Sequence, residues 1–341
     1  MVGQEKSLET DIDMTQYHSL LFIIAGCCLT AACDTDVEKI EVQKPYTYSE
    51  QYYEQLRAFK KSAHEISYVY YADWAPVEGN TNMKNPASWN ERIAGLPDSL
   101  DICNLWMGIP TPETQPVAYA DMVECQKKKG TRFVFHADAS HYNHAFYDRN
   151  DQFEYVDNPS TGSRSYYDLR QTRNEEALKA YARWACDTVV KCGLDGVDFD
   201  YEGWTPADLM VVVKECDRFF GSSSQYADKL VIVDYFNASP PVEIDNYCDY
   251  IVKQAYSGQG AGVGANGHAD EKMVYCESFG QNPTGGQIWK YAAWEPADGR
   301  HKGGCGAFYV ERNYFNTLNG VPYQAIREAI QIMNPAASIS Q

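Results

Sequence analysis

Short β-rich runs alternate with helix-forming segments along most of this chain, and that alternation limits the fold more than any other feature. The runs rich in β-branched and aromatic residues lie at 66–74, 100–107, 131–138, 193–202, 230–237, 250–256, 287–294 and 305–310. Segments with helical periodicity or capping residues lie at 111–128, 174–191, 205–220, 271–279 and 323–333. Eight strands alternating with helices predict an α/β protein with a (β/α)8 TIM barrel. A doubly wound open sheet is the alternative, but it usually has fewer strands and a phosphate loop after the first.

The fourth run carries a row of acidic residues. Side chains alternate between the two faces of a strand, so Asp198, Asp200 and Glu202 share one face. Neighbours in this row lie about 7 Å apart, and carboxylates this close repel one another and lose hydration. A fold does not keep such a row for stability, so we interpret it as the active site. Barrel enzymes bind substrate at the C-terminal ends of their strands, and Glu202 stands at that end.

The N-terminal 32 residues have the features of a targeting segment. Residues 20–32 are apolar or small, too few to span a bilayer, and they end at Cys33. The segment resembles a bacterial lipoprotein signal, with Cys33 as the lipidated residue and Cys27 as the alternative. Residues before the apolar stretch are acidic, and Met14 is a second candidate start. We therefore expect a signal peptide at 1–32, a tether and N-terminal segment at 33–60, and one catalytic domain at 61–341.

Charge and cysteine usage exclude several classes of partner. The formal net charge of -18 disfavours nucleic acid and anionic membrane surfaces. Of the 11 cysteines, eight lie beyond the targeting segment, and none of these has the C-x-x-C spacing typical of zinc sites. Disulfides fit an exported protein, but the sequence does not pair them. We expect a monomer that contacts a membrane only through its lipid anchor, at the bacterial cell envelope or surface.

The fourth strand matches a known signature. Residues 195–202 read D-G-V-D-F-D-Y-E and resemble the D-G-x-D-x-D-x-E motif of glycoside hydrolase family 18, which contains chitinases and endo-β-N-acetylglucosaminidases. The resemblance implies a (β/α)8 barrel that cleaves β-1,4 bonds next to N-acetylglucosamine (GlcNAc), with retention, using the substrate's acetamido group as nucleophile.

The resemblance also implies a role for each acidic residue. Glu202 would be the general acid, since neighbouring negative charge keeps a proton available on a carboxyl group. Asp200 would orient the acetamide and stabilise the intermediate, and Asp198 would share a proton with Asp200. Asp195 lies off this row, so we expect it, with Gly196, to have a structural role.

The sixth run supplies a second match. Gln254 and Tyr256 face the same way near its end, and the family's Tyr at this place hydrogen-bonds the acetamide carbonyl. Chitinases usually have Met-x-Tyr-Asp/Asn here, whereas this chain has Gln-Ala-Tyr-Ser, which favours the endoglycosidase side.

Further residues at strand ends are candidates for substrate binding. Chitinases often place a Trp on the eighth strand, where this chain has Phe308 and Tyr309. Either residue, or Trp294 at the end of the seventh run, would serve as the floor of the sugar site. The other candidates are Trp106, His136 and Tyr235, with Asp234 weighed beside Tyr235; ordinary packing accounts for each of them as well.

Four hypotheses follow for function. The leading one is an endo-β-N-acetylglucosaminidase acting on the chitobiose core of N-glycans, with a GlcNAc-containing glycan or glycoprotein as partner. The rival is a chitinase acting on GlcNAc polymers. A non-catalytic sugar-binding barrel is a different class, but such proteins typically lose the acid that Glu202 supplies. A Mg²⁺ or Ca²⁺ enzyme is a fourth class; because the acidic row lacks His partners and a Lys base nearby, we expect no metal and no cofactor.

Overall fold

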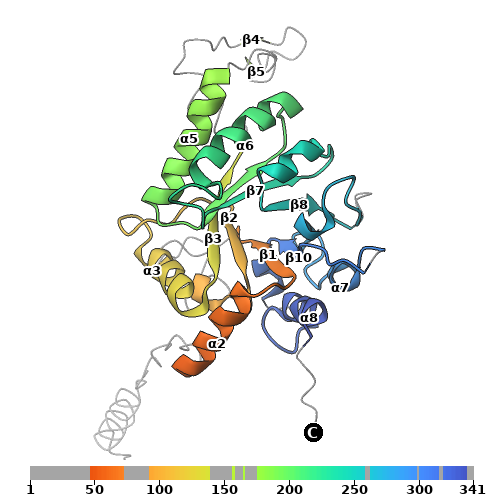
Figure 1. Ribbon diagram of the computed structural model, residues 1–341. Helices are drawn as coiled ribbons and strands as arrows, with labels where there is room; N and C mark the ends of the chain where they lie inside the picture. Colours follow the sequence, from red (N-terminus) through yellow and green to blue (C-terminus); the bar gives the residue numbers. More distant parts are fainter. Residues whose placement is uncertain are drawn as a thin grey trace, which may run out of the picture. The chain divides into compact units, whose positions relative to one another are not determined.

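The computed structural model describes residues 47–72, 92–138, 175–257, 262–297, 299–314 and 318–335, and the backbone of 156–157 and 164–165. Residues Pro45–Gln341 form one compact unit (Figure 1). The expected signal segment, with Cys27 and Cys33, lies outside the described residues. Within the described part of the chain, no helix is both long enough and apolar enough to cross a membrane.

Eight parallel strands close into a barrel, in the order β1-β10-β9-β8-β7-β6-β3-β2 (Figure 1). The strands are β1 (Ile66–Tyr70), β2 (Ile102–Leu105), β3 (Arg132–Ala137), β6 (Gly196–Asp200), β7 (Leu230–Tyr235), β8 (Tyr250–Gln254), β9 (Met273–Ser278) and β10 (Gly304–Phe308). Pairing of Ile66 with Gly304 closes the barrel between its first and last strands. The (β/α)8 barrel predicted from the alternation of runs is therefore confirmed.

Helices follow most of these strands along the chain. They are α2 (Glu50–Lys61), α3 (Pro116–Glu124), α5 (Glu175–Lys191), α6 (Pro206–Phe220), α7 (Ile288–Ala293) and α8 (Gln324–Met333). Shorter turns are η2 (Ile93–Gly95), the π-helical η3 (Cys125–Lys129), η7 (Val242–Asn246), η8 (Asp270–Lys272) and η9 (Val310–Asn313), and a small antiparallel pair is β4 (Val156–Asp157) with β5 (Arg164–Ser165). The predicted cap of α6 is confirmed, because Thr205 forms a capping box with Asp208.

The seventh strand is not where the sequence predicts it. The run 287–294 is largely the helix α7, and the strand is β9, within the segment 271–279 that we expected to be helical. The buried residues Ile288, Tyr291 and Ala292 repeat at helical spacing, and Ala and Lys favour that state. All six residues of β9 are buried, so this strand lacks the alternation of polar and apolar residues that would have identified it.

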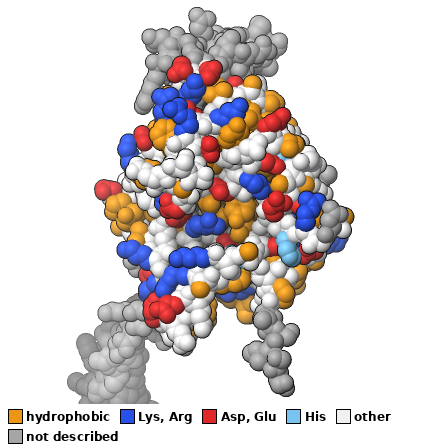
Figure 2. Space-filling view, viewed as in Figure 1, with side chains coloured by type: hydrophobic (Ala, Val, Ile, Leu, Met, Phe, Trp, Pro, Cys, Tyr) orange, Lys and Arg blue, Asp and Glu red, His pale blue; other side chains and the backbone are white. Residues whose placement is uncertain are grey.

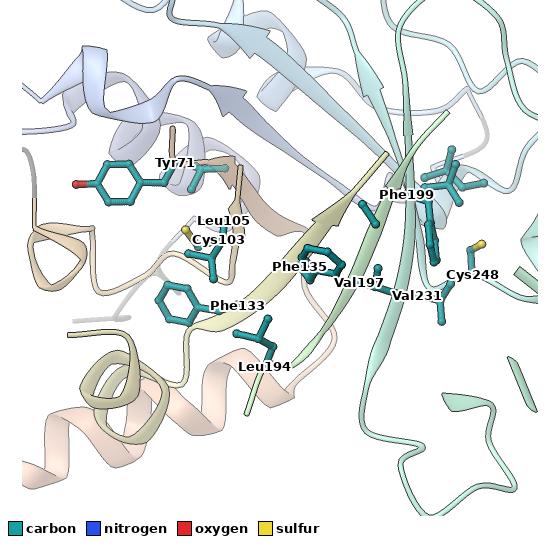
Figure 3. Close-up of a cluster of buried hydrophobic side chains, with 14 of the residues drawn as sticks. Tyr71, Cys103, Leu105, Phe133, Phe135, Leu194, Val197, Phe199, Val231 and Cys248 are labelled. Carbon is teal, nitrogen blue, oxygen red and sulfur yellow. The ribbon is translucent and has the colours of Figure 1, made fainter. Parts of the chain in front are cut away.

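Two apolar layers hold the barrel together. The outer layer lies between strands and helices, and Figure 3 shows Phe133 and Phe135 of β3 beside Val197 and Phe199 of β6 in it. The inner layer fills the barrel with Ile66, Tyr68, Tyr70, Ile102, Val134, Leu230, Ile232, Val252, Val274 and Cys276. The strands alternate between the two layers, and Val197, Phe199 and Tyr201 lie in the outer layer, on the face opposite the acidic row.

Helix α2 packs against the N-terminal end of the barrel. Arg57 donates a hydrogen bond to the carbonyl of Lys128 at 2.8 Å, and Lys60 donates one to Oγ1 of Thr131 at 3.2 Å. Burial lowers the pKa of Lys60 to about 8. The last part of the expected tether, residues 50–60, is thus a helix in contact with the barrel.

Cysteines and charges are spread through this unit. The eight cysteines of the described residues are free thiols, and seven of them are buried, where they act as small apolar side chains. Acidic and basic side chains are interspersed on the face that Figure 2 shows. The negative net charge is therefore not concentrated in a single acidic patch on that face.

Candidate active site

The acidic row runs up β6 from the barrel interior to its mouth. Asp198 is fully buried, Asp200 is partly buried at the end of the strand, and Glu202 is exposed just beyond it. The sequence-predicted order, with Glu202 at the rim, is what the structure has. The row therefore combines a carboxyl group open to solvent with two carboxyl groups that are shielded from it.

Asp198 is held by two donors from neighbouring strands. The hydroxyl of Tyr68 and the amide of Asn104 both donate to its Oδ2, the latter at 2.8 Å. Burial raises the pKa of Asp198 to about 6, while the hydrogen bonds from Tyr68 and Asn104 oppose that rise. Its pKa thus lies above the ordinary value for an aspartate but below that of Asp200.

Asp200 favours its neutral form. Burial raises its pKa to about 8, and the negative charges of Glu202, Asp198 and Asp138 add to this effect. Its Oδ1 is buried without a hydrogen-bond partner among the described residues. A proton held on Asp200 at neutral pH relieves the repulsion along the row and leaves a donor close to Glu202.

A third buried carboxyl group faces the row from β7. Asp234 is 1% exposed and pairs with Asp200 in the register of the two strands. Its Oδ2 accepts hydrogen bonds from the hydroxyl of Tyr70 and the amide of Gln254, each at 2.8 Å. Burial, followed by the charges of Asp198 and Asp200, raises the pKa of Asp234 well above its ordinary value. Its position on β7 left open whether Asp234 is a site residue or a packing residue. The structure places it in the candidate site.

His136 and Trp106 lie beside these carboxyl groups. His136 is 7% exposed, and its Nδ1 is 3.2 Å from the amide nitrogen of Asn104. The rings of His136 and Trp106 are 6.4 Å apart, and Trp106 is exposed at the mouth. The structure thus brings both predicted residues to the site.

The expectation that the acidic row lacks a histidine partner is wrong. One ligand atom from each of His136, Asp198 and Asp234 lies within 4.8 Å of the others. Neighbouring strands bring these residues together, which spacing along the sequence does not reveal. Two carboxyl groups and an imidazole are a donor set that could hold a divalent cation, although donors from Tyr68, Asn104, Tyr70 and Gln254 already occupy one oxygen of each carboxyl group.

A pocket of about 580 Å³ opens over the row. It is lined by Glu202, Phe236, Gln254, Tyr256, Ser278, Gly280, Gln281, Phe308, Tyr309 and Arg312. Predicted residues from β6, β8 and β10 therefore meet in one cavity of the size that holds small ligands. The aromatic and hydroxyl groups that line the pocket lie beside the carboxyl group of Glu202, and this combination can bind a sugar ring.

Aromatic rings form one side of this pocket. Tyr256 stacks with Phe308 at 5.9 Å, and Trp106 meets Phe308 edge-on at 5.3 Å. Tyr309 is 5.8 Å from Trp106, and the guanidinium of Arg312 lies 5.6 Å above the ring of Tyr309. Burial, followed by the charge of Asp234, raises the pKa of Tyr256, so its hydroxyl stays a hydrogen-bond donor.

Two predicted binding residues do not reach the pocket. Tyr235 is the outward neighbour of Asp234 on β7, where its hydroxyl accepts from Asn266 at 3.3 Å. Trp294 is the C-cap of α7 and packs edge-on against Tyr275 at 5.3 Å in the outer layer. The first prediction is wrong because alternation allows only one of two adjacent strand residues to face inward, and the second because its run is a helix.

Asp195 and Gly196 lie at the opposite end of β6. Asp195 Oδ2 accepts from Gln126 Nε2 and from the backbone amide of Phe133, both at 2.8 Å. A Cβ on Gly196 would lie 2.5 Å from the carbonyl oxygen of Leu230, so only glycine allows β7 to approach. These contacts join the start of β6 to η3 and to its neighbours β3 and β7.

The segment that follows β7 is tied to the segment that precedes β9. His268, on the second of these segments, contacts Oδ1 of Asp245 through Nδ1 at 2.7 Å and Oγ of Ser239 through Nε2 at 3.2 Å. Asp245 also accepts from the backbone amide of Ala269 at 2.8 Å. These contacts join the connection between β7 and β8 to the connection between β8 and β9.

Sequence reasoning missed several site residues. Tyr68, Tyr70 and Asn104 point into the barrel from the first two strands and donate hydrogen bonds to the buried carboxyl groups. Alternation in the run 66–74 puts Tyr68 and Tyr70 on one face, which was an available signal. No comparable signal marks Arg312, which enters the pocket from η9, or Gln281, which enters it from the turn after β9.

Known proteins resemble the chain over most of its length. Residues 31–278 match the family model described as "Glycoside hydrolase family 18, BT1044-like". A curated relative, endo-β-N-acetylglucosaminidase F2 of Elizabethkingia meningoseptica, is 24% identical over 82% of this chain and 85% of its own length.

Solved structures share the fold. A structure of BT1044 aligns with a TM-score of 0.60 at 21% identity, covering 84% of this chain and 93% of the other. An endo-β-N-acetylglucosaminidase of Cordyceps militaris aligns with a TM-score of 0.59 at 18% identity, covering 86% and 99%. A variant of that fungal enzyme, with a TM-score of 0.60, 18% identity and coverage of 85% and 98%, was solved with fucosyl-N-acetylglucosamine-Asn.

Proposed function

The chain belongs to glycoside hydrolase family 18, and we propose that it is a retaining endo-β-N-acetylglucosaminidase that cuts the chitobiose core of N-glycans. The observation that carries the proposal is the exposed Glu202, which lines a sugar-sized pocket two residues after Asp200, a carboxyl group whose pKa burial raises to about 8. The name of the curated Elizabethkingia relative and the ligand bound to the Cordyceps enzyme support this substrate class.

The proposed reaction uses the substrate's own acetamide. Glu202 gives its proton to the departing glycosidic oxygen while the acetamide carbonyl oxygen attacks C1 and forms an oxazolinium-like ring. Asp200 passes its proton to Asp198 and accepts the acetamide N–H, which stabilises the positive ring. Tyr256 donates to the acetamide oxygen and aligns it for attack. Glu202 then deprotonates the water that opens the ring, so the configuration at C1 is retained.

A substrate panel tests this proposal. The purified protein is assayed on high-mannose glycoprotein, complex-type glycoprotein and chitin oligosaccharides, with released glycans identified by mass spectrometry. We expect glycan release with one GlcNAc left on the protein and little cleavage of chitin. Efficient cleavage of chitin oligosaccharides alone would assign the chain to the chitinases instead.

Variants separate catalysis from binding in the same assay. Glu202→Gln should lower kcat by about 10²- to 10⁴-fold, the usual contribution of a general acid, while glycan binding measured by calorimetry persists. Glu243→Gln, an exposed carboxylate outside the pocket, is the matched control. Equal activity of Glu202→Gln and the unchanged enzyme would exclude Glu202 as the acid.

We further propose that the mature protein is an exported monomer, anchored by lipid on Cys33 at the bacterial cell envelope. The support is the apolar stretch 20–32 that ends at this cysteine. Labelling with a fatty-acid analogue should mark the unchanged protein and the Cys27→Ala variant but not Cys33→Ala. Loss of label only in Cys27→Ala would move the anchor to that residue.

A further inference from the structure

Three carboxyl groups share the interior of the barrel, and each has an oxygen without a partner. Among the described residues, Oδ1 of Asp198, Oδ1 of Asp200 and Oδ1 of Asp234 are buried and accept no hydrogen bond. Asp200 and Asp234 pair in strand register, and an oxygen of Asp198 lies within 4.8 Å of one from Asp234. The site thus contains one carboxyl group more than the acidic row on β6 supplies.

The surroundings of Asp234 oppose a negative charge. The titratable groups that face it are Tyr68 and Tyr70 of β1, His136 of β3, Asp198 and Asp200 of β6, Cys276 of β9 and Tyr256 after β8. No Lys or Arg of the described residues forms an ion pair with it. Burial and the neighbouring carboxylates therefore favour the protonated acid.

The two hydrogen bonds of Asp234 determine which of its oxygens carries the proton. Oδ2 accepts from Tyr70 and from Gln254 at 2.8 Å each, so Oδ1 is the oxygen left for a proton. Gln254 also lines the pocket. Because its Nε2 is committed to Asp234, its Oε1 remains available to accept a hydrogen bond from a sugar hydroxyl or N–H.

We propose that Asp234 is a positioning residue that works as a neutral acid: its Oδ2 fixes the amide of Gln254 so that Oε1 of Gln254 accepts from the substrate. This inference rests on the proposed function, because the ligand that Gln254 meets is the sugar bound over Glu202. In its neutral state Asp234 adds no third negative charge beside Asp198 and Asp200. The proton that Asp200 passes to Asp198 is then not drawn to Asp234 instead.

Two replacements of similar size test the role. In Asp234→Asn the carbonyl oxygen can accept from Tyr70 and Gln254, and the NH₂ group replaces the protonated oxygen. We expect it to keep kcat/KM within a few-fold of the unchanged enzyme, with the same pH profile. Asp234→Leu removes the oxygen that accepts both hydrogen bonds, and we expect KM to rise and kcat/KM to fall by roughly 5- to 150-fold, as for loss of a buried partner.

A double-mutant cycle with Gln254 distinguishes positioning from general damage to the fold. Gln254→Leu should reproduce the loss seen in Asp234→Leu, and the double variant should be no worse than either. Additive losses, or wild-type kinetics in Asp234→Leu, would overturn the positioning role. A large activity loss or a displaced pH profile in Asp234→Asn would show that the residue acts as an anion.

Two measurements on the protein alone check the protonation state. The infrared band of a protonated carboxyl group, present at neutral pH in the unchanged protein, should be reduced in Asp234→Asn. A raised pKa in the folded state means that stability is lost as pH rises past the unfolded value of about 3.9. The melting temperature of Asp234→Asn relative to the unchanged protein should therefore increase with pH.

These readouts also separate this inference from the proposed function. If no glycan is cleaved by the unchanged protein, the proposed function fails, yet the infrared band and the pH dependence of stability still decide the state of Asp234. An unaltered band and a pH-independent stability difference would overturn the neutral acid. So would activity that disappears with chelator and returns with Mg²⁺ or Ca²⁺, because the carboxyl group would then be a ligand.

Discussion

The hydroxyl of Tyr68 on β1 donates a hydrogen bond to Oδ2 of Asp198 on β6, across the interior of the barrel. The two residues are 130 positions apart in sequence, and closure of the barrel is what brings them together. Both are fully buried, so the bond is shielded from water and favours the charged form of Asp198.

Tyr68→Phe should raise the pKa of Asp198 above its value of about 6, because the variant removes a donor that opposes the effect of burial. The acidic limb of the pH profile of kcat/KM should move to higher pH. The free energy of unfolding should fall by about 1–3 kcal/mol. Tyr52→Phe removes a tyrosine–carboxylate bond at the other end of the barrel and is the control. If the acidic limb does not move, the protonation state of Asp198 does not affect the reaction.

Asp200→Asn should change how stability depends on pH. The folded-state pKa of about 8 is above the ordinary 3.8, so Asp200 binds its proton more tightly in the folded state. Its contribution to stability is complete at low pH and is lost as pH rises through that interval. The melting temperature of Asp200→Asn relative to the unchanged protein should therefore rise as the pH is increased from 3.8 to about 8. The exposed Asp228→Asn should give no such trend; a flat difference for Asp200→Asn would contradict the raised pKa.

The overall barrel could be predicted from the sequence because seven of its eight strands overlap runs rich in β-branched and aromatic residues, and segments with helical features lie between several of these runs. The acidic row could be placed at the mouth because period-two alternation and the end of β6 are local properties. The cross-barrel bonds to Asp198 and Asp234 could not, since they depend on register between strands from distant parts of the chain.

The seventh strand was predicted in the wrong place, because local sequence patterns do not distinguish helix α7 from a strand. The segment 287–294 has the aromatic residues of a strand, but its buried positions follow helical spacing. The true strand β9 ends in Glu277 and Ser278, two polar residues that are buried in the structure. Glu277 is tolerated there because backbone amides surround it, which no local pattern reveals.

Glu277 joins three segments below the pocket. Its Oε1 accepts from the backbone amides of Ser257 at 2.9 Å and Ser278 at 2.8 Å, and its Oε2 from that of Gln287 at 2.8 Å. In Glu277→Gln an NH₂ group must face one of these donors, which should lower the free energy of unfolding by about 1–3 kcal/mol. Urea denaturation measures the loss, and the exposed Glu271→Gln should be nearly neutral. Equal stability of both variants would deny Glu277 this role.

Gly280→Ala should narrow the pocket without touching a catalytic side chain. A Cβ on Gly280 would lie 2.9 Å from Cδ2 of Tyr309, closer than real contacts allow, so the ring must move. That movement is costly, because Tyr309 already has a φ of 56° and its ring is 4.2 Å from Phe308.

Since Tyr309 and Gly280 both line the pocket, the displaced ring should enter the space where sugar binds. We expect KM to rise roughly 5-fold or more, as for overpacking that costs about 1–3 kcal/mol, with a smaller change in kcat because Glu202 and Asp200 are untouched. Gly262→Ala is the control, since its Cβ would meet no atom within 4 Å. An unchanged KM together with a shifted Tyr309 would place the bound sugar elsewhere along the barrel mouth, on the side of Trp106.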